Sequence, residues 1–130
     1  MTNAANQILI VDDEPSVLKM VSVYLRRLGY AVVTAGSTEK AWAEVEAAPH
    51  AFALAVLDAT MSGVRMEDLA ARMLAADARV CVIAASGYPV DIAKLQAAAP
   101  GRVMFLQKPF TPEMLGNAVR RMLATQEEDV

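Results

Sequence analysis

The pattern that decides the fold stands in Ile8-Leu9-Ile10-Val11-Asp12-Asp13-Glu14-Pro15. Four consecutive apolar residues predict a buried strand, and two aspartates and a glutamate follow it directly. Pro15 begins a helical apolar pattern that reaches Leu28, where Gly29 gives the usual stop signal. A short apolar strand that leads straight into an amphipathic helix is the βα unit of a parallel sheet.

The same unit recurs four more times along the chain. Further strands are predicted at Ala31–Thr34, Ala53–Leu57, Val80–Ala85 and Val103–Leu106. The helices after them are predicted from the N-cap Ser37 to about Ala48, over Met66–Ala76, from about Pro89 to Ala98, and from the cap Thr111 and Pro112 to about Leu123. The strands are continuous apolar runs, so both faces of the sheet must be covered by helices. We therefore predict an α/β fold: a doubly wound, five-stranded parallel sheet of order 2-1-3-4-5, the flavodoxin-like (βα)5 arrangement.

Composition places the chain in a general class. Its 130 residues predict one domain, 1–130, with a core of about 7–124, a polar N-terminal arm and an acidic C-terminal tail over 125–130 that frays. The apolar share of 55% is globular, and the net charge of -3 is too mild to indicate nucleic acid as a direct partner. No uncharged run exceeds eleven residues, which excludes a membrane span, and no signal peptide precedes the first strand. A cytoplasmic protein is the expectation.

Polar side chains follow four of the predicted strands. Asp12 and Asp13 follow the first strand, Asp58 the third, Ser86 the fourth, and Lys108 stands two residues past the fifth. The carboxyl ends of parallel strands meet at one edge of the sheet, and ligands bind there at the switch in strand order. We expect these five side chains to gather at that edge.

Three neighbouring carboxylates repel one another unless one is protonated or a cation lies among them. Hard oxygen ligands without histidine or thiolate suit Mg²⁺, which takes one or two carboxylates together with a phosphate group. Lys108 and Ser86 supply a cation and a hydrogen-bond donor for such an anion. The chain has no glycine-rich nucleotide loop, so the simplest phosphoryl acceptor is a carboxylate, and Asp58 is the central one.

At this point the residues resemble the receiver domain of two-component response regulators. The matching motifs are Ile10–Pro15, Leu57–Met61, Ala85–Tyr88 and Lys108–Phe110, and the resemblance runs from about Gln7 to Leu123. Asp12, Asp58, Ser86 and Lys108 follow one another at intervals of 46, 28 and 22 residues. The sequence around Ser86 and Lys108 is similar to that of receivers associated with hybrid sensor kinases. We expect a stand-alone receiver.

The resemblance implies a role for each polar residue. Asp58 would accept phosphate from the phosphohistidine of a sensor histidine kinase or a histidine phosphotransfer protein. Asp12 and Asp13 would hold Mg²⁺ together with Asp58, and the backbone carbonyl of Thr60 would be a further ligand. Lys108 would pair with Asp58 before phosphorylation and with the phosphate afterwards. The protein would then be a switch or relay with at most slow self-dephosphorylation, and not an enzyme with a substrate of its own.

The resemblance also implies a conformational readout. Ser86 would bond to the arriving phosphoryl group, and Phe105 would turn inward into the space that Ser86 leaves. The surface of the fourth helix, fifth strand and fifth helix would change for a protein partner, and the Lys108-Pro109 bond is expected to be cis. The chain departs from the family in the loop after Asp58, where Ser62 replaces a proline and Met66 stands in the place of a glycine.

Other interpretations of the same residues remain open. Asp13 is also a suitable helix cap, and Phe105 is also an ordinary core residue. A pseudo-receiver that only binds partners is the first alternative function. A haloacid-dehalogenase-type phosphatase is the second, although it requires an aspartate where Thr60 stands and a cap domain for which 130 residues leave little room. A flavin module is weaker still, since the acids after the first strand would repel a flavin phosphate.

Overall fold

The strands form one five-stranded parallel sheet in the order β2-β1-β3-β4-β5, as predicted. The structure, a computed structural model, describes residues 7–61 and 65–128. The strands are β1 (Gln7–Val11), β2 (Ala31–Ala35), β3 (Phe52–Asp58), β4 (Cys81–Ser86) and β5 (Val103–Gln107). Every residue of β3 and β4 is buried, which explains why these strands are continuous apolar runs in the sequence.

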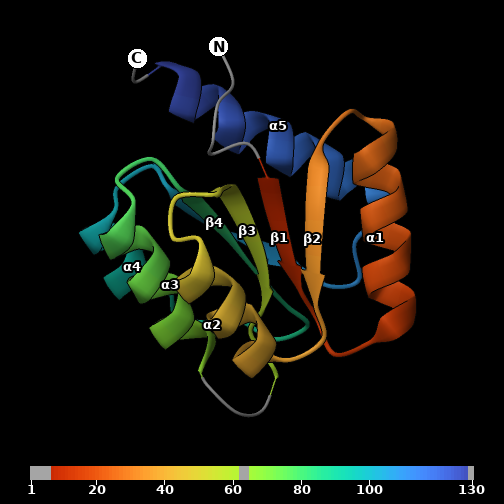
Figure 1. The fold of residues 1–130 in the computed structure, drawn as a ribbon, viewed down its shortest axis with the longest axis horizontal. Helices are drawn as coiled ribbons and strands as arrows, with labels where there is room; N and C mark the ends of the chain where they lie inside the picture. Colours follow the sequence, from red (N-terminus) through yellow and green to blue (C-terminus); the bar gives the residue numbers. More distant parts are fainter. Residues whose placement is uncertain (1–6, 62–64, 129–130) are drawn as a thin grey trace.

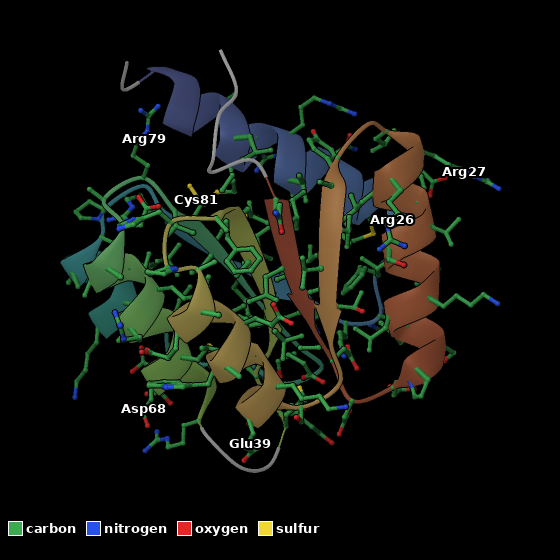
Figure 2. All side chains as sticks on the ribbon, in the orientation of Figure 1. Arg26, Arg27, Glu39, Asp68, Arg79 and Cys81 are labelled. Atoms are coloured by element: carbon green, nitrogen blue, oxygen red, sulfur yellow. The ribbon has the colours of Figure 1, made fainter. Side chains whose placement is uncertain are left out.

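Helices cover both faces of the sheet (Figure 1). The helices are α1 (Pro15–Arg27), α2 (Thr38–Ala47), α3 (Met66–Ala76), α4 (Ala93–Ala98) and α5 (Pro112–Glu128). One core cluster lies between the sheet and α2, α3 and α4, and the other lies between the sheet and α1 and α5. Side chains fill both spaces (Figure 2), so two helical layers sandwich the sheet.

The parallel register brings the strand ends together. Val11 pairs with Leu57, Asp58 with Ala85, and Ser86 with Gln107. The residues just beyond β1, β3, β4 and β5 therefore meet at one edge of the sheet, which is the lower edge in Figure 1. This is the edge at which the sequence predicts the polar cluster.

Several strand and helix ends differ from the prediction by one residue, and two helix boundaries differ by more. The fourth helix begins at Ala93 and not near Pro89, because Oδ1 of Asp91 accepts the N–H of Ala93 over 2.9 Å and the four residues before Ala93 are not helical. The last helix continues to Glu128, where a fraying tail from Thr125 is predicted. Alanine, glutamine and glutamate are strong helix formers, so the acidic composition of that segment is compatible with helix.

No helix within the described residues is both long and apolar enough to cross a lipid bilayer.

Candidate functional site

The carboxyl ends of two neighbouring strands, β1 and β3, position the three acidic residues. Asp12 directly follows β1, Asp13 comes next in the turn before α1, and Asp58 is the last residue of β3. Each of the three offers one carboxylate oxygen, and these oxygens all lie within 4.8 Å of one another. Asp12 and Asp58 are each only 4% exposed, whereas Asp13 faces solvent. The structure therefore brings together the three carboxylates that the sequence analysis singled out.

Lys108 lies in the loop after β5, and its side chain contacts two of these carboxylates. Its Nζ donates to Oδ2 of Asp12 over 2.8 Å and to Oδ2 of Asp58 over 3.3 Å. Burial by itself lowers the pKa of the Lys108 ammonium, but the hydrogen bond and charge of Asp12, together with the charge and hydrogen bond of Asp58, outweigh it and raise the pKa above its ordinary value. Lys108 is therefore charged at neutral pH and links both buried carboxylates.

Local hydrogen bonds fix the orientation of the two buried carboxylates. Oδ1 of Asp12 accepts the backbone N–H of Glu14 over 3.0 Å. Oδ1 of Asp58 accepts both the backbone N–H of Thr60, over 3.0 Å, and its hydroxyl, over 2.7 Å. The N-cap position of α1 is Glu14, with no side-chain cap, so the alternative in which Asp13 caps that helix does not hold.

Ser86 is the last residue of β4, and Phe105 lies on the neighbouring strand β5, where it pairs with Ala84. Ser86 is completely buried, and its Oγ accepts the backbone N–H of Tyr88 over 3.0 Å. The backbone N–H of Lys108 donates to the carbonyl of Ser86 over 2.8 Å, which ties the end of β4 to the loop that carries the lysine. Phe105 is half-buried and packs against the core on the side of α2, α3 and α4. The Lys108-Pro109 bond is cis, as the resemblance implies.

The loop after Asp58 is only partly described. Ser62, one of the two departures from the family pattern, lies outside the described residues. Met66, the other departure, is the first residue of α3, and its side chain is buried in the core under the helix. A large apolar side chain at this position therefore serves the packing of α3 against the sheet.

The donor set fits a small divalent cation. The carboxylates of Asp12, Asp13 and Asp58 supply hard oxygen ligands that lie close enough together to contact one ion. Thr60 stands two residues after Asp58 in the same turn. Within this group of described residues, the ammonium of Lys108 faces three carboxylates, so negative charge is in excess there. Oxygen ligands of this kind are those that Mg²⁺ binds in proteins.

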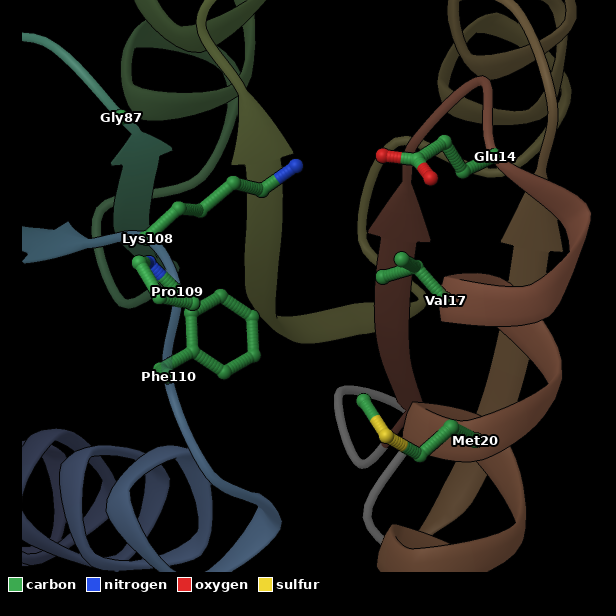
Figure 3. A pocket seen from close by; sticks show the side chains of 7 residues that line it. All are labelled: Glu14, Val17, Met20, Gly87, Lys108, Pro109 and Phe110. Carbon is green, nitrogen blue, oxygen red and sulfur yellow. The ribbon is translucent and has the colours of Figure 1, made fainter.

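A groove opens beside the acidic group, between α1 and the loop after β5. Its volume is about 450 Å³. Figure 3 shows Val17 and Met20 of α1 on one wall, Pro109 and Phe110 on the other, and the charged ends of Glu14 and Lys108 directed toward the gap between them. A second groove of about 490 Å³ shares Met20 and continues along the outer face of α1. The acidic group is thus reached along a mainly apolar surface.

The chain belongs to the response regulator receiver domain family, whose model matches residues 8–120. It is 31% identical to the response regulator GtcR of Aneurinibacillus migulanus over 105 residues, which are 81% of this chain and 42% of that protein. It spans about half the length of the curated relatives it matches, at 42%, 55% and 52%.

Solved structures agree with this family. A CheY-like receiver domain protein from Methanospirillum hungatei superposes with a TM-score of 0.84 at 25% identity, covering 97% of this chain and 99% of that one. The receiver domain of the hybrid histidine kinase CckA superposes with a TM-score of 0.75 at 27% identity, covering 90% and 98%. The chain is therefore a response regulator receiver of two-component signalling, with the fold that its sequence predicts.

Sequence reasoning misses two contacts in the site: the bond from the Thr60 hydroxyl to Asp58 and the bond from Lys108 to Asp12. It points to Thr60 only for its backbone carbonyl. The available signal was local, because a threonine two positions after an aspartate at a strand end is well placed to bond back to that carboxylate.

Proposed function

We propose that Asp58 accepts a phosphoryl group from the phosphohistidine of a sensor histidine kinase or histidine phosphotransfer protein. A carboxylate oxygen of Asp58 attacks phosphorus, the P–N bond to the donor imidazole breaks, and its electron pair stays on the imidazole nitrogen. The observation that carries this proposal is the position of Asp58, buried at the sheet edge with Lys108 Nζ 3.3 Å from its Oδ2. Lys108 is there to stabilise charge on the transferred oxygens.

The reaction is proposed to depend on Mg²⁺. Asp12, Asp13, Asp58 and the carbonyl of Thr60 are the groups that would hold the ion, supported by the clustering of the three carboxylates within 4.8 Å. When bound, Mg²⁺ neutralises charge on the phosphoryl oxygens and on the surrounding carboxylates. The chain's own contribution is to orient Asp58 through Thr60, to place Lys108 beside it and to shield it from bulk water.

The grooves along α1 are proposed as the surface on which the phosphate donor docks. Met20 and Val23 of α1 are 41% and 39% exposed, large values for apolar residues, and they line the second groove together with the cations Lys19 and Arg27. Figure 2 shows Arg27 projecting from α1 toward solvent. A helix with apolar residues and acidic flanks complements such a face, and the first groove leads from it to Lys108.

We further propose that phosphorylation is a switch and not a catalytic turnover. The added phosphoryl group carries about −1.5 to −2 charges at neutral pH, and contacts from Lys108 and Ser86 would hold it. Movement of Ser86 toward the phosphate would free space for Phe105, which is half-buried on the neighbouring strand, where it pairs with Ala84 two residues before Ser86. The result is a changed surface around α4, β5 and α5 that a protein partner recognises, or a phosphate that is relayed onward.

The direct test is phosphoryl labelling of defined variants. The wild type, Asp58→Asn and the exposed control Glu44→Gln are incubated with acetyl phosphate and Mg²⁺ and weighed by intact-protein mass spectrometry. We expect one added phosphoryl group in the wild type and the control, none in Asp58→Asn, and none in any of them with excess EDTA. Unchanged labelling of Asp58→Asn would reject the assignment. A wild type that takes no phosphate would indicate a pseudo-receiver, and steady release of phosphate from phosphate esters would indicate a phosphatase.

A further inference from the structure

A groove with an apolar base opens between α3 and α4, on the face of the sheet opposite α1 and α5. The two helices lie side by side in Figure 1, and the groove between them has a volume of about 390 Å³. Leu95 is buried and Val90 is partly buried, and both pack against the core beneath these helices. Ala71 of α3 is exposed and adds only a methyl group, so a larger side chain at position 71 would fill part of the groove.

Charged side chains surround this apolar base. Glu67 and Asp68 belong to the first turn of α3, and Glu67 pairs with Arg65 over 2.7 Å. Asp91 precedes α4, and Lys94 is in its first turn. In the part of the chain that the structure describes, Asp68, Asp91 and Lys94 form no ion pair. The three carboxylates outnumber the two cations, and two of them have no cationic partner.

We propose that this α3–α4 groove is a docking site for a segment of a partner protein that carries an arginine beside an apolar residue. The aliphatic stem of the arginine packs on Val90 and Leu95. Its guanidinium donates to the free carboxylates of Asp68 and Asp91, and the neighbouring apolar residue fills the space beside Ala71. This inference concerns a different surface from the grooves along α1, and it does not require phosphorylation of Asp58.

Charge and shape together favour this occupant. An acidic segment would be repelled by the excess of carboxylates. A purely apolar segment would displace water from Asp68 and Asp91 without replacing its hydrogen bonds, which costs free energy. A small cation would leave Val90 and Leu95 uncovered. An arginine beside an apolar residue matches both the charge and the apolar base.

The position of the groove links it to the candidate site. The helix α3 follows β3, which ends at Asp58, and α4 follows β4, which ends at Ser86. Figure 2 shows Asp68 near the lower end of α3, toward the edge of the sheet at which the site lies. A partner in the groove therefore contacts the two helices into which these strands lead.

The experiment titrates the full chain with a short amidated peptide of leucine, arginine and glutamine and follows its backbone amide signals by two-dimensional NMR. Two comparison probes are the same peptide with glutamate in place of every arginine, and spermidine, a linear cation without apolar side chains. We expect the arginine peptide to shift signals of α3 and of residues 90–95. The acidic peptide should not bind, and spermidine should bind at least ten-fold more weakly than the arginine peptide.

Three variants change the charge of the groove. Asp91→Asn keeps the Oδ1 atom that accepts the N–H of Ala93, so the start of α4 is retained. Asp68→Asn and Asp91→Asn should each weaken binding of the arginine peptide about two- to five-fold, the size of an exposed charge pair. Lys94→Gln should instead strengthen it about two-fold, because it removes a repelling cation. Glu44→Gln, on the exposed face of α2, should match the wild type.

A fourth variant tests the shape of the groove without changing its charge. Ala71→Met should weaken binding of the arginine peptide at least five-fold by filling the groove, and Ala43→Met on the exposed face of α2 should not. The spectrum of each variant before titration shows that it is folded.

No binding of the arginine peptide at about 1 mM, or equal binding of the acidic peptide or spermidine, would overturn the inference. Wild-type affinity in both Asp68→Asn and Asp91→Asn, or in Ala71→Met, would also overturn it. Signals that shift in the same region when the free chain alone is concentrated would assign the groove to a second copy instead. None of these results would affect the assignment of Asp58, which the phosphoryl labelling tests separately.

Discussion

The ammonium of Lys108 lies closer to Asp12 than to Asp58, with Nζ–Oδ2 distances of 2.8 and 3.3 Å. The family resemblance implies that this lysine pairs with Asp58 before phosphorylation. In this structure it links the two buried carboxylates, which belong to different strands and would otherwise repel each other. Lys108 therefore contributes to the stability of the sheet edge as well as to the proposed chemistry.

Replacing Lys108 with methionine should destabilise the metal-free protein by about 2 kcal/mol, because Asp12 and Asp58 would remain buried without a cation. The free energy of unfolding is measured by urea titration at neutral pH in the presence of EDTA. Lys19→Met, which removes an exposed lysine from α1, is the control and should change the stability by less than about 0.5 kcal/mol. Equal stability of the wild type and Lys108→Met would contradict the pairing.

The contribution of Lys108 should also depend on pH in a defined direction. Its pKa in the folded state is raised above the ordinary value of 10.5. The ammonium therefore binds its proton more tightly in the folded state, and the stabilisation is fully present below about 10.5 and lost as the pH rises through the raised pKa. The difference in unfolding free energy between the wild type and Lys108→Met should be constant from neutral pH up to that range and then shrink. A difference that disappears well below 10.5 would contradict this assignment.

Asp13→Asn should have opposite effects on stability without and with Mg²⁺. Without the ion, removing one of three carboxylates within 4.8 Å of one another relieves repulsion, so the variant should be more stable by about 0.5–1 kcal/mol. With the ion, the wild type gains stability by binding it and the variant should gain less. Thermal unfolding of the wild type and the variant in EDTA and in MgCl₂ measures the two effects, and Glu44→Gln is the control. Equal stabilisation of wild type and Asp13→Asn by Mg²⁺ would exclude Asp13 as a ligand.

Gly116 allows α5 to approach α1 closely. A Cβ at this position would lie 2.9 Å from Cε2 of Tyr24 and 3.4 Å from Cδ1 of Leu28. Gly116→Ala should therefore destabilise the protein by about 1 kcal/mol, although alanine is the better helix former by a similar amount. In a Tyr24→Leu background the main obstacle is gone, and the same substitution should become stabilising. A double-mutant cycle by urea unfolding checks this, and an unchanged sign in the Tyr24→Leu background would refute the contact.

Much of the fold could be predicted because the apolar runs of the central strands stop where polar residues begin. The apolar run of β3 stops at Asp58 and that of β1 stops before Asp12, so the edge of the sheet is visible in the sequence. The start of α4 could not be predicted in the same way. Its segment is mostly small residues with weak periodicity, and the bond from Ala93 to Asp91 sets the boundary.

The members of the site could be predicted, but their pairing could not. Strand order brings Asp12, Asp58 and Lys108 to one edge, and a parallel sheet of order 2-1-3-4-5 requires no more than that. Which carboxylate lies nearer the lysine depends on side-chain torsions across three strands, and these leave no trace in sequence spacing. The hydroxyl of Thr60 has a local signal, its place two residues after Asp58, but a threonine in a turn has many other ordinary explanations.

The most direct test of the central claim is to map the phosphorylated residue. The protein is incubated with acetyl phosphate and Mg²⁺, treated with borohydride, which reduces an acyl phosphate to the alcohol, and digested for peptide mass spectrometry. We expect homoserine at position 58 and nowhere else, and none when EDTA replaces Mg²⁺. Reduction at Asp12 or Asp13 instead, or no reduction at any aspartate, would contradict the assignment of Asp58 as the phosphate acceptor.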